Sequence, residues 1–444
     1  MTPQPPNSPS DLPAPRRVCF FRRPAYGAFD PRGPTFGGAE VRSHKFAVAL
    51  AERPGFDVSF VVEHSGQPRE QRFGKVLVVS EPPRPKRGLM ERLYLRHFRP
   101  YAHVSEGFPY LHVERLHPSL LFSVPVLLGH RVLKTRMPLS LRMPRPHPLP
   151  VLRELKPDVV CCFGATGGAA DVIATCRAEG ARSLLFLVHD WEADAEVLAS
   201  GDYIEPLFDY GRRIRYAVKG ADGVVVQTEQ QRELVRRCHG REAVVLHNPI
   251  NLSGAVPLPA AEREFVFWVG RAEAPAIAHK RPELCVELAR RLPEIPFVAV
   301  MNPVDAGVFA ALKMAAPGNL MLIETVPRDQ IEGYFRRAAV FTNTSSHEGF
   351  PNTFLEAAKY QTPIVSLAVD PDGFLSRHGC GVACAGDLDR MAAEVRSLWG
   401  DSARRVELGA TARRYIEREY ELSACIDQLA KLIETKCQEP HSRR

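Results

Sequence analysis

The chain has 444 residues, a length that favours two α/β domains over one small binding module. Hydrophobic residues make up 45% of it and charged residues 25%, which are ordinary values for folded protein and exclude disorder along the whole chain. The formal net charge is +7. The 10 cysteines form no CxxC pair, so we interpret them as core thiols of a cytoplasmic protein and not as a disulfide or zinc framework.

The first residues predict no anchor. Residues 1–15 contain six prolines and no apolar run, which is typical of a disordered tail and not of a signal peptide. No stretch reaches the ~18 apolar residues that a transmembrane helix needs. The best candidate, residues 119–129, is short and contains Pro125. We therefore expect a protein that does not cross a membrane.

Positive charge is concentrated in residues 64–150, a Pro-rich excursion with 15 Lys and Arg against 5 Asp and Glu. It is either a long solvated segment that happens to be basic, or a surface for anionic partners such as membrane headgroups or a phosphorylated acceptor. We expect loose, salt-sensitive contact with anionic membrane, peripheral on the inner membrane face. Nucleic acid is not an expected partner, because the aromatic residues of the segment belong to no known module.

Short β-branched runs alternate with helical patterns along the first half of the chain, which indicates βαβ units and a parallel sheet. Expected strands are Arg17–Phe21, Val58–Glu63, Val76–Ser80, Asp158–Phe163, Ser183–His189, Gly223–Thr228 and Ala243–Asn248. Expected helices are Ala39–Ala51, Gly168–Ala178, Glu205–Val218 and Glu229–Cys238.

A second series follows a Pro- and Ala-rich linker at 251–262. Its expected strands are Phe265–Gly270, Phe297–Met301, Leu320–Glu324, Val340–Thr344 and Pro363–Ala368. Its expected helices are Pro282–Arg291, Asp305–Ala315, Arg328–Ala338, Asn352–Tyr360 and Leu388–Trp399, with a helical tail after Asp401. The predicted fold class is α/β, with two doubly wound Rossmann-like domains at 16–250 and 263–420 that face each other across a cleft.

Ligands of open α/β sheets bind outside the carboxyl ends of the strands, so chemistry should concentrate at strand-to-helix turns. The strongest such turn is HEGFPNTFLEA, which follows a strand that ends near Thr344. In it, Gly349 allows a tight turn, and Pro351 is tolerated at a first helical position. The helix that follows presents unpaired N–H groups and a positive dipole end, which suit a phosphate or diphosphate. Glu348 and Glu356 are too far apart to form a dyad, so they should contact different parts of one extended ligand. Because a carboxylate repels a phosphate, we expect both to contact hydroxyl groups, Glu348 on a hexose and Glu356 on a ribose. The competing interpretation is an ordinary solvated loop.

Three further turns carry candidate residues. Arg271 follows Gly270 at a strand end, and with Lys280 it could neutralise a leaving diphosphate without a metal, unless both are simply solvated charges. Gly37 and Gly38 open a helix and would let a ligand approach the backbone. His189 ends an apolar strand and could hydrogen-bond a sugar or relay a proton, although a lone histidine is more often structural.

One turn imitates a nicotinamide-binding site. Gly164, Gly167 and Gly168 follow a strand, but at least three strands precede it and Ala170 stands in place of a third glycine. A dehydrogenase is therefore disfavoured.

With these residues assembled, the second half resembles family 4 of the nucleotide-sugar-dependent glycosyltransferases (glycosyltransferase group 1 type). The resemblance lies in the Glu-x7-Glu motif from Glu348 to Glu356, in Gly270-Arg271, and in Lys280 with the Arg-Pro that follows it. GGAE at 37–40, His189 and the HNP turn at 247–249 fit the first half of that family. The resemblance to this family covers most of residues 17–62 and 158–438.

The resemblance implies the GT-B fold, retention at the anomeric carbon and no divalent metal or other cofactor besides the nucleotide diphosphate sugar. It assigns Arg271 and Lys280 to the donor diphosphate, and the backbone of Gly349, Phe350, Pro351 and Asn352 to phosphate and sugar. It places Glu348 on the transferred sugar, Glu356 on the ribose, and Thr325 and Val326 near the base. Gly37 and Gly38 would line the donor–acceptor junction, with His189 on the acceptor side. It also implies that residues 421–444 contain a helix that crosses back to the first domain.

Two departures from the family pattern stand out. The segment between Arg271 and Lys280 (AEAPAIAH) is longer than the family's short turn, which puts the reach of Arg271 in doubt. Gln361 stands near the helix end where a glycine is typical, which could shift that end.

The expected function is retaining sugar transfer, of hexosyltransferase type, from a nucleotide diphosphate sugar to a glycan or lipid-linked acceptor in polysaccharide or glycoconjugate synthesis. Two alternatives remain open. One is a GT-B nucleotide-sugar epimerase, which would use water in place of an acceptor. The other is a non-catalytic sugar-nucleotide or polysaccharide-binding protein.

Overall fold

The structure, a computed structural model, describes residues 14–30, 37–81, 148–165, 167–193, 210–272, 279–303 and 305–440, with short pieces between 98 and 129. The predicted tail at 1–15 lies almost wholly outside these ranges, as do residues 205–209 at the start of one predicted helix.

The first domain is built on an eight-stranded sheet of order β10-β9-β8-β7-β1-β2-β4-β3. All its neighbouring strands are parallel except β3 and β4, which pair antiparallel. The strands are β1 (Arg16–Phe21), β2 (Phe56–Glu63), β3 (Glu70–Phe73), β4 (Val76–Glu81), β7 (Val159–Phe163), β8 (Arg182–Phe186), β9 (Gly223–Val226) and β10 (Val244–Val245). Its helices are α1 (Tyr26–Phe29), α2 (Gly38–Ala51), α6 (Pro150–Leu155), α7 (Gly167–Glu179), α9 (Tyr210–Gly220) and α10 (Glu229–His239), with 3-10 turns at Arg23–Ala25 and Asp190–Glu192.

Helices cover both faces of this sheet, as the alternation of buried side chains along the strands requires. In β1, Cys19 and Phe21 belong to the apolar cluster beneath α6, α7 and α9, whereas Val18 and Phe20 belong to the cluster beneath α2. Because these strands are covered on both faces, their sequences are continuous apolar runs. This is the doubly wound arrangement that the sequence predicts.

The basic excursion is anchored in the first domain at both ends, and β4 is the strand expected at Val76–Ser80. Residues 64–81 are part of the first domain, because β3 and β4 extend its sheet, and residues 150–155 form α6 against the same sheet. Within the part of the excursion that the structure describes, β5 (Phe98–Arg99) and β6 (His112–Val113) form an antiparallel pair. Most of residues 82–147 lie outside the described ranges.

The second domain is built on a six-stranded parallel sheet of order β13-β12-β11-β14-β15-β16. Its strands are β11 (Phe265–Ala272), β12 (Phe297–Pro303), β13 (Leu320–Ile323), β14 (Ala338–Asn343), β15 (Ile364–Ser366) and β16 (Gly381–Ala383). Its helices are α11 (Pro282–Arg291), α12 (Ala306–Ala315), α13 (Arg328–Arg337), α14 (Asn352–Lys359), α15 (Leu388–Gly400) and α16 (Ser402–Glu419), with 3-10 turns at Ala260–Glu262 and Pro371–Gly373.

The end of α14 is preserved despite the missing glycine. The helix ends at Lys359, and Gln361 takes a left-handed backbone conformation with φ of +54°. Glycine adopts this conformation freely, whereas other residues do so at a cost of about 1–2 kcal/mol. The substitution therefore leaves the helix end in place and stores modest strain there.

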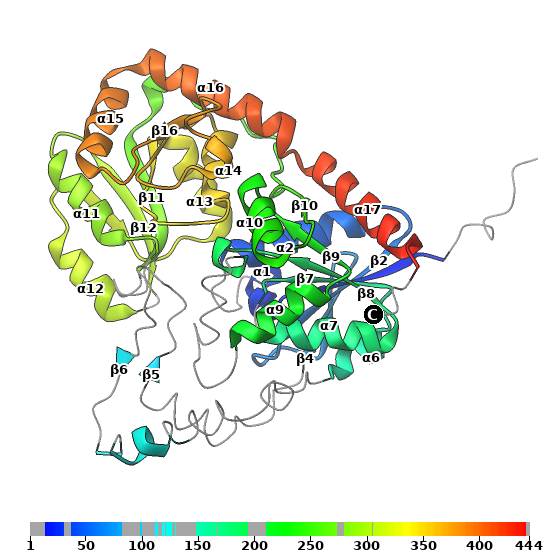
Figure 1. Cartoon of the computed structure of the whole chain (residues 1–444). Helices are drawn as coiled ribbons and strands as arrows, with labels where there is room; N and C mark the ends of the chain where they lie inside the picture. The colour runs from blue at the N-terminus through cyan, green and yellow to red at the C-terminus, as the bar shows by residue number, and fades with distance from the viewer. Residues whose placement is uncertain are drawn as a thin grey trace, which may run out of the picture.

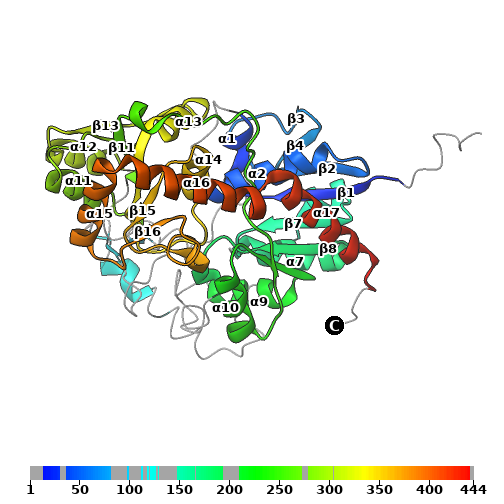
Figure 2. The ribbon, with the colours of Figure 1, turned by 90° about the horizontal axis from the view of Figure 1, so that it is seen from above.

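The last helix, α17 (Leu422–Gln438), returns to the first domain. Its apolar residues Cys425, Ile426, Leu429 and Ile433 join the same buried cluster as Phe46 of α2. Figures 1 and 2 show α16 running along the second domain and α17 continuing across to the first. The structure thus has the two Rossmann-like domains and the returning C-terminal helix expected of the GT-B fold. No helix in the described part of the chain has both the length and the hydropathy that a membrane span requires.

Candidate functional site in the interdomain cleft

The glycine-proline turn lies after β14, at the carboxyl edge of the second sheet. Phe350 is 4% exposed and its ring packs against those of Phe374 and Tyr420. Pro351 is the N-cap residue of α14, one position earlier than the sequence suggests, and the helix begins at Asn352. The aromatic packing therefore fixes the turn, and α14 presents its first N–H groups and positive dipole end at the edge where ligands bind.

Glu348 lies beside Lys280, on the loop that leads into this turn. Its Oε1 is 2.7 Å from Lys280 Nζ and accepts hydrogen bonds from Ser345 Oγ at 2.6 Å and Asn343 Nδ2 at 3.1 Å. Burial alone would raise the pKa of Glu348, but the Lys280 ammonium, and after it His279, outweigh that effect and bring the pKa to about 2. The carboxylate is therefore ionised and held in one orientation.

Lys280 is itself positioned by the end of β14. Thr344 Oγ1 donates to Lys280 O at 2.8 Å and accepts from Trp268 Nε1 at 2.9 Å. Arg281 Nε donates to Thr344 O at 2.8 Å, which ties the start of α11 to the same loop. A Cβ on Gly270 would lie 2.6 Å from the Trp268 ring, so Gly270 makes room for the indole. No sequence motif marked Thr344 or Trp268 as supports of the lysine.

Arg271 reaches the first domain in spite of the long segment that follows it. A Cβ on Gly37 would lie 2.8 Å from Arg271 Nη2, so the guanidinium packs directly against the glycine turn. On the other side of that turn, Asn352 Nδ2 donates to Gly38 O at 3.0 Å. The structure therefore brings the predicted junction glycines, the strand-end arginine and the start of α14 together.

Gly349 packs closely against the first domain. A Cβ there would lie 2.8 Å from Gln231 Nε2, 2.9 Å from Gln227 Nε2 and 3.2 Å from the carbonyl oxygen of Val188. The residue after Val188 is His189, whose ring centroid is 6.5 Å from that of His279. Because β8 ends at Phe186, His189 lies beyond the strand and not at its last position as predicted.

Glu356 and the base loop lie further along the second domain. Glu356 Oε1 is 3.2 Å from Lys45 Nζ of α2, and its Oε2 is buried with no hydrogen-bond partner among the described residues. Thr325 is exposed and Val326 half-buried in the loop between β13 and α13. Glu356 was expected to contact a ribose, and its pairing with Lys45 was not foreseen.

Two further side chains, Asn248 and Asp372, form hydrogen bonds between the domains. Asn248 Nδ2 donates to Gln227 Oε1, Phe350 O and Asn352 Oδ1 at 3.0–3.1 Å, so it joins the linker end of the first domain to the start of α14. The Asp372 carboxylate accepts the backbone N–H groups of Glu229 and Gln230 at 2.8 and 3.0 Å, and so caps α10 of the other domain. The HNP turn pointed to Asn248, but nothing marked Asp372, which has a φ of +52°.

Two carboxyl groups near His189 are held in a partly protonated range. Burial raises the pKa of Asp190 to about 6; the hydrogen bond from Gln231 Nε2 opposes this, and the charges of Asp372 and Glu348 add to it. Glu192 is 1% exposed, and burial raises its pKa to about 7 although Val188 N donates to its Oε2 at 2.7 Å. Both groups border the loop that carries His189.

The substitution Glu192→Gln should make stability less dependent on pH. Since the folded pKa of Glu192, about 7, exceeds the ordinary glutamate value of 4.5, its contribution to stability is complete below pH 4.5 and is lost as pH rises through 7. Between these pH values the free energy of unfolding should fall by at most about 1.4 kcal/mol per pH unit because of this group. Urea denaturation at pH 5 to 8 should show the variant gaining stability relative to wild type as pH rises. A difference that stays constant over this range would mean that Glu192 does not titrate there.

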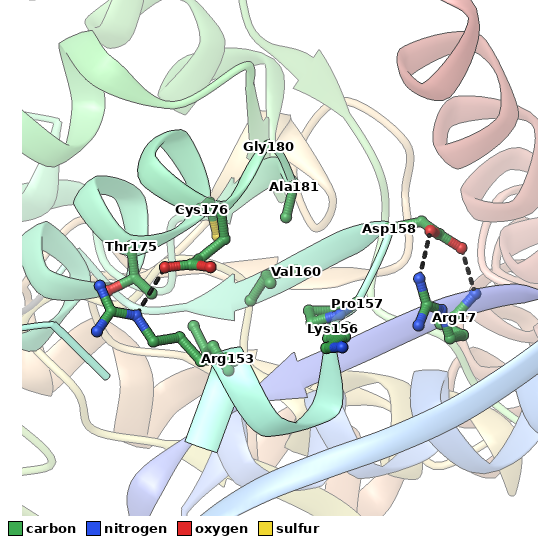
Figure 3. Close-up of a pocket in the computed structure, with 12 residues that line it drawn as sticks. Arg17, Arg153, Lys156, Pro157, Asp158, Val160, Thr175, Cys176, Gly180 and Ala181 are labelled. Atoms are coloured by element: carbon green, nitrogen blue, oxygen red, sulfur yellow. Dashed lines mark hydrogen bonds and ion pairs between the residues drawn. The ribbon is translucent and has the colours of Figure 1, made fainter. Parts of the chain in front are cut away.

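The pockets detected in the described residues lie outside this cluster. One has a volume of about 380 Å³ and is flanked by the pairs Arg17–Asp158 and Arg153–Glu179. It lies at the amino ends of β1 and β7 (Figure 3). Ligands of α/β sheets bind at the opposite edge, so we do not place the site there. A second, of about 530 Å³, lies between the domains beside Asp372. Among the residues described, no group of three or more His, Cys, Asp or Glu is arranged to hold a metal ion.

The fold and this cluster define a two-domain protein of GT-B type with charged strand-end turns facing each other across a cleft. Residues 266–401 match the family described as Glycosyl transferases group 1. A comparison with curated protein sequences found no match.

Solved structures resemble the chain over nearly its whole length. Sucrose-phosphate synthase from Thermosynechococcus elongatus is 15% identical with a TM-score of 0.64, over 95% of this chain and 98% of that one. An α,α-trehalose-phosphate synthase (UDP-forming) from Burkholderia xenovorans, in complex with glucose-6-phosphate, is 16% identical with a TM-score of 0.62, over 94% and 100%. A trehalose-6-phosphate structure from E. coli bound with UDP-2-fluoro glucose is 14% identical with a TM-score of 0.63, over 96% and 99%. At these identities the likeness establishes the fold, and together with the family match it supports a glycosyltransferase.

Proposed function

We propose that the protein is a retaining glycosyltransferase, similar to family 4, that transfers a hexose from a nucleotide diphosphate sugar to a glycan or lipid-linked acceptor. The observation that carries the proposal is that Arg271 and the start of α14 meet the first domain at Gly37 and Gly38, while Lys280 is held by Glu348 on the loop that leads into α14. Two cations and a helix N-terminus at one cleft suit a diphosphate. Surface polysaccharide or glycoconjugate synthesis is the pathway class that we propose.

Each group then has a defined part. Arg271 and Lys280 neutralise the charge that develops on the leaving diphosphate, with the N–H groups after Pro351. Glu348, ionised and aimed by Lys280, accepts hydrogen bonds from sugar hydroxyls, and Glu356 accepts from the ribose. Thr325 and Val326 border the base. His189 contacts the reacting sugar from the acceptor side.

The transfer step needs no dedicated protein base. The acceptor hydroxyl oxygen bonds to the anomeric carbon as the bond from that carbon to the phosphate oxygen breaks. The hydroxyl proton passes to the leaving phosphate on the same face, which preserves the anomeric configuration. Because protein cations can stabilise this charge, we propose that turnover needs no divalent metal, and it should persist in excess EDTA.

The test is a panel of nucleotide sugars screened by thermal shift on the full chain, followed by turnover with the donors that bind. A bound donor raises the melting temperature by mass action. Release of nucleoside diphosphate that depends on acceptor supports transfer. Free sugar epimer from donor alone, seen by NMR, would instead indicate the epimerase, and binding without turnover would indicate the non-catalytic binding protein.

We also propose that the reaction takes place in the cytoplasm at an anionic membrane surface. The ten cysteines are free thiols, as in a reducing compartment. In the short helix at 121–126, Leu121 and Phe122 are 78% and 79% exposed, within the excursion that carries the surplus of ten positive charges. Exposed apolar side chains beside basic residues favour anionic lipid. Co-sedimentation with phosphatidylglycerol vesicles should occur at low salt and weaken at high salt; absence of binding at low salt would refute the contact.

A further inference from the structure

Lys45 extends from the first domain to a carboxylate of the second. It lies on α2, the helix that begins at Gly38, and its Nζ is 3.2 Å from Glu356 Oε1. Both side chains are about one-fifth exposed, at 19% and 20%. The same two helices also meet where Asn352 Nδ2 donates to Gly38 O. Helices α2 and α14 therefore contact each other at two points, and Lys45 forms the charged one.

The two oxygens of Glu356 have different environments. Oε1 faces Lys45, whereas Oε2 is buried and accepts no hydrogen bond from the residues that the structure describes. A buried carboxylate oxygen without a donor is unfavourable, so a ligand hydroxyl that reached Oε2 would be bound strongly. The ion pair engages Oε1 alone and leaves Oε2 without a donor among the described residues.

Other charged groups beside the pair are already engaged. The carboxylate of Glu332, on α13, accepts hydrogen bonds from Lys359 Nζ at 2.9 and 3.0 Å and from the hydroxyl of Tyr360. Burial would raise the pKa of Glu332, but these hydrogen bonds and the charges of Lys359 and Lys45 lower it. Since Lys359 is committed to Glu332, Lys45 is the cation that balances Glu356.

We infer that Lys45 is a positioning residue through which the first domain completes the ribose subsite of the donor. Lys45 holds Glu356 by Oε1 so that Oε2 accepts from a ribose hydroxyl, and this arrangement exists only when the cleft is closed. Recognition of the ribose and closure of the cleft are thereby coupled. The inference rests on the proposed function and deepens it, because it makes discrimination of ribose depend on a residue outside the donor-binding domain.

The experiment compares ribonucleotides with deoxyribonucleotides on the full chain. Isothermal titration would measure UDP, GDP and ADP, and then the 2′-deoxy and 3′-deoxy forms of whichever binds. Wild type should bind the ribonucleotide roughly 10- to 100-fold more tightly than at least one deoxy form, as expected for a hydrogen bond to a charged group. Lys45→Met should reduce this ratio to about 3-fold or less, and Lys45→Arg should restore most of it.

Controls separate this role from a structural one. Lys75→Met removes a lysine of the same domain from an exposed pair with Glu52, and it should leave the ratio unchanged. Hydrogen exchange should show faster exchange in both α2 and α14 for Lys45→Met with nucleotide bound, while β1 and β7 keep their protection. Wild type that binds no nucleoside diphosphate would overturn the proposed function. Wild type that discriminates ribose while Lys45→Met discriminates equally well would overturn the inference alone.

Discussion

Replacing Lys280 with alanine should lower kcat/KM for the nucleotide-sugar donor by roughly 100- to 1,000-fold, the effect of removing one preorganised charge contact from a transition state. The substitution also leaves Glu348, whose side chain is 12% exposed, without its ammonium at 2.7 Å. Loss of one member of a buried pair destabilises by about 3–5 kcal/mol. Steady-state kinetics and urea denaturation would measure the two effects separately.

The double variant Lys280→Ala, Glu348→Gln is the matched control for this prediction. Glutamine removes the unpaired charge and keeps one acceptor for Ser345 Oγ and Asn343 Nδ2. Stability should therefore recover while turnover stays low. Near-normal kcat/KM in the Lys280→Ala single variant would contradict its assignment to the diphosphate.

Glu348 should also make the stability of the folded protein depend on pH in the acid range. Its folded pKa of about 2 lies below the ordinary glutamate value of 4.5, so its contribution to stability is complete above pH 4.5 and is lost as pH falls through 2. The Lys280→Ala variant, whose Glu348 has lost the ammonium that lowers its pKa most, should lose stability at a higher pH than wild type does.

Gly349→Ala should impair closure of the cleft and lower kcat/KM by roughly 10- to 100-fold, which corresponds to about 1–3 kcal/mol of overpacking. The added Cβ would lie 2.8 and 2.9 Å from the amide nitrogens of Gln231 and Gln227. Neither amide can move freely, because Gln231 donates to Asp190 Oδ1 at 2.9 Å and Gln227 to Val188 O at 3.0 Å. Kinetics and small-angle scattering should show lower activity and a larger radius of gyration.

This clash exists only while the domains are in contact, so each domain should keep its own stability. Gly318→Ala is the control, since a Cβ there meets nothing within 4 Å. If Gly349→Ala leaves both the activity and the radius of gyration unchanged, the close approach of Gly349 to the first domain is not required for turnover.

The sequence predicted the repeating strands and helices well wherever an element is buried along its length. The runs before His189 and around Phe267 are continuous and apolar because both faces of those strands are covered. Sequence reasoning missed β3 and β16, which are short edge strands. Three of the four residues of β3 are polar, and both strands owe their pairing to a neighbouring backbone and not to a hydrophobic pattern.

The sequence by itself determined which chemical groups stand at the strand ends, because a glycine turn, a helix N-terminus and a nearby lysine are local features of the chain. It could not determine which side chains meet across the cleft. The pairing of Lys45 with Glu356 joins residues 311 positions apart, and Asp372 caps a helix 143 positions away. Those contacts depend on how the domains face each other, and that arrangement is held by contacts distant in sequence, among them the packing of α17 into the first domain.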